Sequence, residues 1–413
     1  MISDKRSFYG WRVVAAAFVL AVCGWGMGFY GPPVYLHAVR AARGWSLALV
    51  STAVTTHFLI GAIVVANLPA LYRRFGLATV TKLGGLALAA GVIAWATATA
   101  PWQLLAATII SGAGWAASGG AAINAIVSPW FVRTRPAALS MAYNGASIGG
   151  VVFSPLWVVA IDGLGFATAA TVVGAVVALT IWVLAERLFS RTPQQMGLAP
   201  DGDVAGAPAA TVATRDAKPL ASASLWRDRR FLTLAAGMAI GLFVQVGLIA
   251  HLFSLLVPAL GAPLAGIAMG AATAAAIAGR TVVGWLMPAG ADRRRVACVN
   301  YVVQIVGSLA FMAAAGTNVP LLILGVLLFG VGIGNTTSLP PLIAQAEFAE
   351  ADVGRVVSLI VAISQAAYAF APAAFGMIRE LSGVDGGATP FFATAALIQV
   401  LAIAALLMGR GGR

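Results

Sequence analysis

The stretch GIAMGAATAAAIAGRTVVGWLM, residues 266–287, consists almost entirely of small and apolar residues. As an α-helix it would rise about 33 Å, enough to cross the roughly 30 Å hydrocarbon core of a bilayer. It carries one charge, Arg280, with no acidic residue beside it. The stretch therefore predicts a membrane-spanning helix and singles out one arginine within it.

The composition of the whole chain is typical of a membrane protein. Of its 413 residues, 61% are hydrophobic and only 9% are charged, whereas a soluble protein has about a quarter charged residues. Cys23 and Cys298 lie far apart in apolar segments, so we expect neither a disulfide framework nor a metal site. The first apolar segment is far longer than a signal-peptide core, so a cleavable signal is not expected.

Similar segments recur along the chain and predict twelve transmembrane helices. They lie at about residues 11–37, 46–71, 79–99, 101–131, 135–161, 166–189, 231–260, 263–289, 295–316, 319–346, 354–380 and 389–409. The one long polar interval, residues 190–230, has the composition of a flexible linker. We therefore expect an all-α membrane protein with a six-helix bundle at 1–189, a cytoplasmic linker at 190–230 and a second six-helix bundle at 231–413.

The distribution of lysine and arginine predicts the orientation. With both termini in the cytoplasm, 21 of the 25 basic residues face inward, and only Arg40, Arg43 and Arg379 face outward; the last cation is Arg280. Cytoplasmic loops carry an excess of Lys and Arg, so this distribution predicts an even number of spans. It explains the net charge of +12 without a nucleic-acid partner. The loop cations, residues 293–295 included, are expected to serve topology and contact anionic lipids.

A weak internal repeat indicates two related halves. PALYRRF begins at Pro69 and PAGADRRR at Pro288, 219 residues later, and GAGW at 112 is followed by GVGIG at 330, 218 residues later. Two such halves around an axis along the membrane normal form one large class of transporters, whose binding site lies between the halves.

Four segments resemble bacterial major facilitator proteins of the monocarboxylate transporter type, which are related to the oxalate/formate antiporter group. They are FYGWRVVAAAF (8–18), LYRRFG (71–76), SPWFVRTRPAALSMAYNGASIGG (128–150) and RTPQQMGLAPDG (191–202). The resemblance implies the major facilitator fold, two pseudo-symmetric six-helix bundles that rock to give alternating access. It also implies transport of small organic acids, often with a proton, and a helix 8 arginine that receives the carboxylate. Arg280 matches that arginine.

Three positions depart from the pattern of these relatives. Arg73 stands where the loop after helix 2 usually has an acidic residue; in the superfamily this loop, here with Arg73, Arg74 and Gly76, latches the cytoplasmic ends of the halves. Phe29 and Ala276 stand where animal relatives have a helix 1 lysine and a helix 8 aspartate. These departures leave the fold unaffected and bear on proton coupling and on the substrate.

Arg280 is the strongest candidate for a substrate ligand. A central arginine costs at least about 2.5–3.5 kcal/mol on insertion scales, so it should face a partner or a water-filled cavity. No Asp or Glu lies deep inside any predicted span. A carboxylate ligand would accept two charge-assisted hydrogen bonds from the guanidinium. The alternative is a structural arginine bonded to helix carbonyls or water.

Other polar residues within predicted spans give further candidates. His251 is predicted to be a second ligand or a proton carrier, and His57 a second proton carrier, because histidine titrates near neutral pH. His37, near the outer end of the first helix, is expected to be solvated. The remaining substrate-binding candidates, which could also hold membrane helices together, are Tyr30, Asn124, Gln365 and Tyr368.

Together these features predict a proton-coupled secondary transporter of a small monocarboxylate anion such as lactate or pyruvate. We expect a monomer in the bacterial inner membrane, with no cofactor and no enzymatic activity. Anion exchange, export of inorganic anions or amphipathic compounds, and a membrane sensor without transport stay open as alternatives. The sequence lacks the H-E-x-x-H, paired intramembrane aspartate, Ser–Lys and phosphate-loop patterns of the enzyme classes considered.

Overall fold

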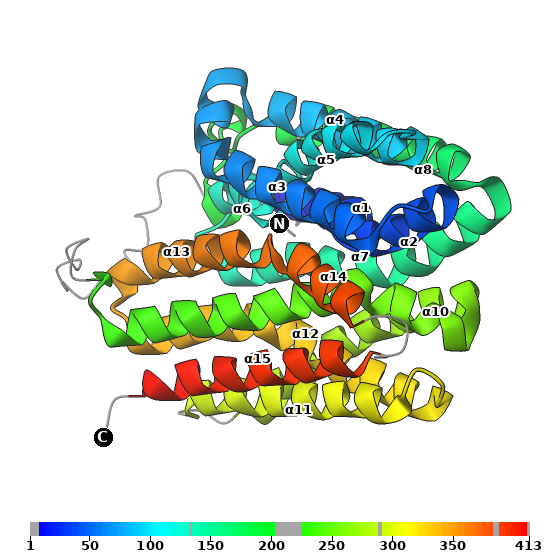
Figure 1. The fold of residues 1–413 in the computed structure, drawn as a ribbon. Helices are drawn as coiled ribbons and strands as arrows, with labels where there is room; N and C mark the ends of the chain where they lie inside the picture. The colour runs from blue at the N-terminus through cyan, green and yellow to red at the C-terminus, as the bar shows by residue number, and fades with distance from the viewer. Residues whose placement is uncertain (1–7, 133, 203–224, 288–290, 383–387, 411–413) are drawn as a thin grey trace. The chain divides into compact units, whose positions relative to one another are not determined.

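The computed structural model describes residues 8–132, 134–202, 225–287, 291–382 and 388–410, which form helices joined by short connections (Figure 1). Within these residues, eleven helical segments are long and apolar enough to cross a membrane. The prediction of an all-α membrane protein is confirmed. The number of spans differs by one from the predicted twelve.

The difference arises in α10 (Arg229–Leu286). Its 58 residues are more than twice what one crossing requires. At Gly261 the backbone leaves the helical region, with φ 72° and ψ 161°, and prolines at 258 and 263 flank the break. A positive φ is readily adopted by glycine, which has no Cβ. When α10 is counted as one span, the total is eleven. When α10 is divided at Gly261, its two parts correspond to the two spans predicted at 231–260 and 263–289.

The spans of the first half include two that are interrupted. α1 (Tyr9–Gly28) and α2 (Gly31–Arg43) form one apolar segment, as do α5 (Pro101–Ala116) and α6 (Gly120–Val127). The others are α3 (Leu47–Phe75), α4 (Leu77–Thr97), α7 (Arg135–Leu164) and α8 (Phe166–Leu184). The first segment ends at Arg43, beyond the predicted residue 37. Arg40 and Arg43 occupy its last turn, where cations stabilise the helix dipole.

The second half continues after α10 with five helices. They are α11 (Arg293–Ala314), α12 (Val319–Glu347), α13 (Glu350–Tyr368), α14 (Ala371–Leu381) and α15 (Thr389–Met408). Of these, α13 and α14 form one interrupted span, with Ala369 and Phe370 between them.

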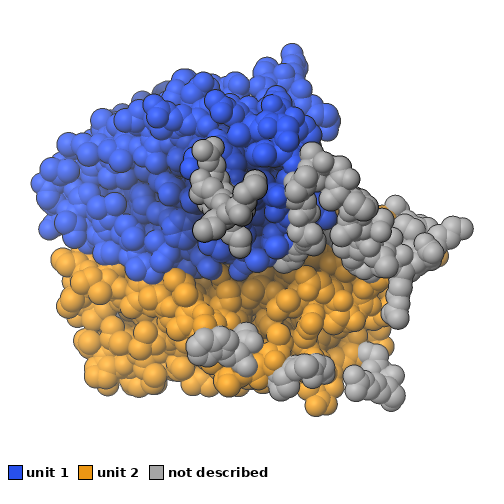
Figure 2. All heavy atoms as spheres, turned by 180° about the vertical axis from the view of Figure 1, so that it is seen from behind, with its two compact units in different colours: residues 1–35, 60–211 blue, residues 36–59, 212–413 orange. Residues whose placement is uncertain are grey.

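The chain divides into two compact units, coloured separately in Figure 2. Unit 1 comprises Met1–Tyr35 and Ile60–Thr211, and unit 2 comprises Leu36–Leu59 and Val212–Arg413. The end of α2 and the first part of α3 thus belong to the same unit as α10 to α15. The predicted division at residues 189 and 231 stays a prediction.

Small residues allow close helix packing inside unit 1. A Cβ on Gly114 of α5 would lie 2.2 Å from the backbone nitrogen of Leu88 in α4. A Cβ on Gly145 of α7 would lie 2.2 Å from the carbonyl oxygen of Phe18 in α1. Both distances are too short for a real carbon, so these helix pairs depend on glycine, as is common between membrane helices.

Buried polar side chains join three helices inside unit 2. Gln304 of α11 donates to Thr336 Oγ1 of α12 at 3.1 Å. Gln399 of α15 donates to Gln304 Oε1 at 3.4 Å and accepts from Ser308 Oγ at 3.2 Å. α11 and α15 also lie side by side in Figure 1. The polar residues of α11 therefore hold helices together, as interhelical hydrogen bonds do in lipid.

The beginning of the predicted linker is docked on unit 1. It contains two short 3-10 helices, η3 (Gln194–Met196) and η4 (Pro200–Gly202). The Asp201 carboxylate accepts hydrogen bonds from the backbone nitrogens of Val132 and Thr134 at 3.0 and 3.1 Å, and from Thr134 Oγ1 at 2.6 Å. This differs from a linker that is flexible throughout. Residues 203–224 lie outside the described residues.

Candidate functional site

Arg280 lies in the part of α10 that follows Gly261, beside α12. A Cβ on Gly279 would lie 2.3 Å from the carbonyl oxygen of Val331, and a Cβ on Gly334 would lie 2.5 Å from the carbonyl oxygen of Ala276. A Cβ on Gly334 would also lie 3.3 Å from Arg280 Nε. The small residues around Arg280 therefore let α12 approach closely and hold the half-buried guanidinium against it.

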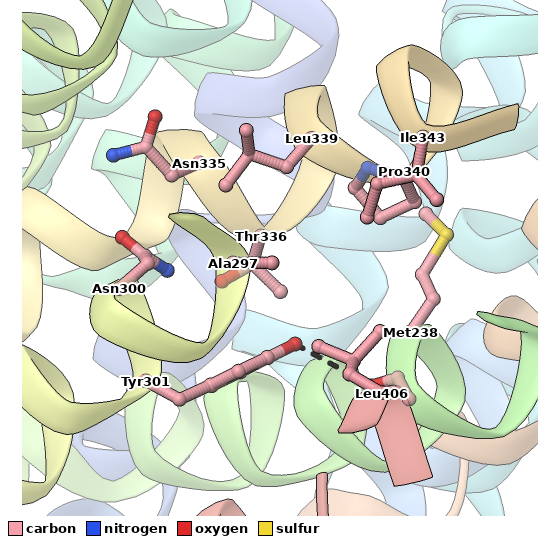
Figure 3. A pocket seen from close by; sticks show the side chains of 11 residues that line it. Met238, Ala297, Asn300, Tyr301, Asn335, Thr336, Leu339, Pro340, Ile343 and Leu406 are labelled. Atoms are coloured by element: carbon pink, nitrogen blue, oxygen red, sulfur yellow. Dashed lines mark hydrogen bonds between the residues drawn. The ribbon is translucent and has the colours of Figure 1, made fainter. Parts of the chain in front are cut away.

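A small void lies between α10, α11, α12 and α15 in unit 2 (Figure 3), and its lining is mostly apolar. The amides of Asn300 and Asn335 and the hydroxyl groups of Tyr301 and Thr336 are part of its lining, and Tyr301 donates to the carbonyl oxygen of Gly237 at 3.4 Å. Asn335 Oδ1 is buried without a hydrogen-bond partner among the described residues. The void has room for about one water and is too small for an organic acid.

His251 lies in the part of α10 that precedes Gly261 and is fully buried, with 0% of its surface exposed. Its Nε2 lies 2.9 Å from the carbonyl oxygen of Pro372 in α14, so this nitrogen carries the proton and donates. Its Nδ1 is buried and has no hydrogen-bond partner within the described ranges. The ring edge packs against Phe391, with centroids 5.8 Å apart. His251 therefore has one nitrogen held by the helix and one that could bind a proton.

His57 and Tyr368 lie in the same neighbourhood of unit 2. His57, buried in α3, is in ring contact with Phe58, and Phe58 packs edge-on against Tyr368 with centroids 6.0 Å apart. Thr55 Oγ1 accepts a hydrogen bond from the backbone nitrogen of Ala373 at 3.1 Å, which ties α3 to α14. Gln365 is half-buried on α13, three residues before Tyr368.

Tyr30 and Asn124 belong to unit 1. Tyr30 is buried at the break between α1 and α2, where its backbone nitrogen donates to the carbonyl oxygen of Trp25. Asn124 is exposed on α6, and its Oδ1 accepts from Ser128 Oγ at 2.9 Å. The other five candidates (Arg280, His251, His57, Gln365 and Tyr368) belong to unit 2. Participation of all seven in one site stays a prediction.

The predicted conformational loop lies at the end of α3. Arg73 and Arg74 are exposed in its last turn, and Arg74 packs over the ring of Phe75 at 5.2 Å. Gly76 follows with φ 81°, a conformation that favours glycine. The latching role of this loop stays a prediction.

Arg294 corrects the expectation that the cations at 293–295 serve only topology and lipid contact. Its side chain is 1% exposed, and Nε and Nη2 donate to the Glu347 carboxylate at 2.6 and 2.8 Å. It also donates to Thr233 Oγ1 and to the carbonyl oxygens of Leu406 and Arg230. The expectation was wrong for Arg294 because α12 ends with a carboxylate that neutralises it. Sequence spacing does not reveal a pair 53 residues apart.

His37 also differs from its prediction. It is half-buried, and its ring packs edge-on against Phe253 of α10 with centroids 5.3 Å apart. Because α2 extends to Arg43, the histidine lies within a helix, in the part of it that belongs to unit 2, so it is not fully solvated.

A sequence model described as the Major Facilitator Superfamily matches residues 10–372. The Mus musculus protein monocarboxylate transporter 11 is 27% identical over 175 residues, which cover 41% of this chain and only 37% of that protein.

Solved structures with a similar fold include two transporters. The nucleoside transporter NupG has a TM-score of 0.74 at 15% identity, covering 98% of this chain and 100% of that one. A D-xylose-proton symporter has a TM-score of 0.70 at 15% identity, with 97% of each chain covered. At these identities the likeness shows the fold alone.

Proposed function

The chain belongs to the Major Facilitator Superfamily, and from this premise we propose that it is a secondary transporter of a small monocarboxylate anion. The partial similarity to a monocarboxylate transporter supports this substrate class. Alternating access by two helical bundles would carry the anion from one side of the membrane to the other. Lactate and pyruvate are the simplest candidates.

The observation that carries the proposal is the position of Arg280. A guanidinium has five N–H donors, no acceptor, and a shape that binds a carboxylate through two parallel hydrogen bonds. Arg280 presents this group from an apolar helix, half-buried and beside Gly334. A Cβ at Gly334 would lie 3.3 Å from Nε, so glycine at this position lets the guanidinium lie against α12 without a steric clash.

Proton coupling is assigned to His251, with His57 as the alternative carrier. His251 holds one ring nitrogen on Pro372 and leaves Nδ1 without a partner among the described residues. A proton that binds Nδ1 would cross the membrane together with one carboxylate anion. The net charge moved would then be zero, so transport would be electroneutral. If the protein is instead an exchanger, internal anion rather than a pH gradient would drive uptake.

Uptake of labelled lactate or pyruvate into proteoliposomes tests the proposal. Arg280→Gln should lower affinity by about 10- to 100-fold, because a hydrogen bond to a charged group contributes about 1.5–3 kcal/mol. Arg295→Gln is the matched control, since Arg295 is 67% exposed in its side chain. Normal uptake by a correctly folded Arg280→Gln protein would rule out Arg280 as the carboxylate ligand.

A further inference from the structure

A second cationic cluster lies in unit 2, where α2, α10 and α14 meet. Arg40 is in the last turn of α2, and Arg379 is in the last turn of α14. Both side chains are half-buried, and their positive charges repel each other. Like charges held together in a partly desolvated place repel each other, so this arrangement calls for a compensating anion.

The hydrogen bonds of this cluster lead from arginine to histidine. Arg379 Nη1 donates to Ser254 Oγ at 2.7 Å, and Ser254 Oγ donates to the carbonyl oxygen of His251 at 2.8 Å. Arg40 and Arg379 also interact electrostatically with the rings of His37 and His251. Two permanent cations and two titratable rings therefore share one region.

Acidic side chains of the described residues do not neutralise this region. Within the described ranges, neither Arg40 nor Arg379 forms an ion pair with a carboxylate. The neighbouring Glu380 is exposed, and its Oε2 accepts from the backbone nitrogen of Ala48 at 3.2 Å. That carboxylate is engaged at the beginning of α3, where a negative charge favours the helix dipole.

Buried polar atoms beside the arginines also lack protein partners. Arg40 Nε, His251 Nδ1 and Ser51 Oγ are all buried and without a hydrogen-bond partner in the part of the chain that the structure describes. A Cβ on Gly376 would lie 2.4 Å from Ser51 Oγ and 3.5 Å from His251 Cε1, so the serine and histidine meet at this glycine. Buried polar groups are normally hydrogen-bonded. A hydrated anion would supply a partner to each.

We propose that Arg40, Arg379 and Ser254 form a second anion-binding site, separate from Arg280, for a small monovalent anion. The guanidinium groups would bind the charge, and the serine hydroxyl would complete its hydrogen bonds. A free carboxylate and chloride share the required chemistry. If the proposed function holds, the site lies where the Lys and Arg distribution predicts the outer side, and it would concentrate the cargo before transport. Anion binding itself does not require transport.

Thermal unfolding of the full chain in detergent tests the site directly. Chloride, and separately lactate, is titrated against the bulky sulfonate 2-(N-morpholino)ethanesulfonate at constant ionic strength. The Arg280→Gln protein serves as the background, so that the central site makes no contribution. A ligand that binds only the folded state raises the melting temperature saturably. We expect this rise in the wild type and in Arg280→Gln, and its loss in Arg40→Gln and Arg379→Gln.

The control is Arg43→Gln, because Arg43 is exposed in the same last turn of α2 and should leave the titration unchanged. Arg379→Lys keeps the charge and should weaken the apparent affinity several-fold if Arg379→Gln does not fold. A response to lactate alone would assign the site to carboxylates, and a response to both anions would assign it to small anions generally.

The inference is overturned if neither anion stabilises the protein, or if Arg379→Gln responds like the wild type. Failure of the proposed function would look different, because the wild type would then take up neither lactate nor pyruvate, or Arg280→Gln would transport them normally, whatever the titration shows.

Discussion

Two basic stretches with similar sequences, PALYRRF at the end of α3 and PAGADRRR before and within α11, have different environments. In the first, Arg73 and Arg74 extend into solvent from the last turn of α3. In the second, Arg294 is buried against the Glu347 carboxylate. Asp292 caps α11 by accepting from the backbone nitrogens of Arg294 and Arg295 and pairs with Arg410 at 2.8 Å.

The difference comes from the acidic residues that the two stretches can reach. In unit 2, Glu347 and two backbone carbonyl groups satisfy the guanidinium of Arg294, so it can leave water. In unit 1, Arg73 stands at the position where the resemblance to major facilitator proteins predicts an acidic residue. A similar run of cations thus forms a buried ion pair in unit 2 and an exposed helix end in unit 1.

The largest expected effect is that of Glu347→Gln. It leaves the charge of Arg294 buried without a carboxylate, and breaking a buried pair in this way costs about 3–5 kcal/mol. Unfolding in mixed micelles would measure the change in free energy. Arg295→Gln is the control, because exposed ion pairs contribute at most about 1 kcal/mol. Equal stability of Glu347→Gln and wild type would mean that Arg294 does not depend on this pair.

A smaller effect is expected from Asp292→Ala, which removes the cap of α11 at a cost of about 1 kcal/mol. Burial raises the pKa of the Asp292 carboxyl, but the Arg295 backbone N–H and the Arg410 charge outweigh it and lower the pKa below 3.8. The folded state therefore binds this proton less tightly than the unfolded state. The stabilisation is fully present above about pH 4 and is lost as pH falls through the lowered value.

Acid unfolding curves of the wild type and of Asp292→Ala would test this direction of the pH dependence. The difference in stability between wild type and Asp292→Ala should narrow below about pH 4. Asp292→Asn should keep most of the cap at neutral pH, because asparagine caps helices about as well as aspartate. A difference that stays constant across the acid range would show that the charge contributes nothing.

The smallest effect is expected from Arg73→Gln and Arg74→Gln. Exposed substitutions away from buried contacts change stability by less than about 0.5 kcal/mol, and both side chains are solvated. Unfolding in the same micelles gives a direct comparison with Glu347→Gln. If Arg73→Gln lowered the free energy of unfolding as much as Glu347→Gln does, the contrast between the two halves would be removed.

Much of the fold could be predicted because it depends on local properties. The length and polarity of a segment decide whether it crosses the membrane, and Gly261 with its flanking prolines separates two such segments. The interruptions at Phe29 and Tyr30 and at Ala369 and Phe370 were not predicted, since the apolar character continues through them. The docking of Asp201 also depends on a distant partner.

The candidate site divides in the same way. Arg280 stands out in the sequence because a charge within an apolar helix is costly wherever the helix packs. The sequence likewise determined the membrane class, the approximate spans and the cationic stretches, which follow from composition and spacing along the chain. Only the tertiary structure decided that Arg294 meets Glu347 and that Arg40 lies near Arg379. Electrostatic energy depends on distance and burial in space, and residues remote in sequence acquire both only when the helices pack.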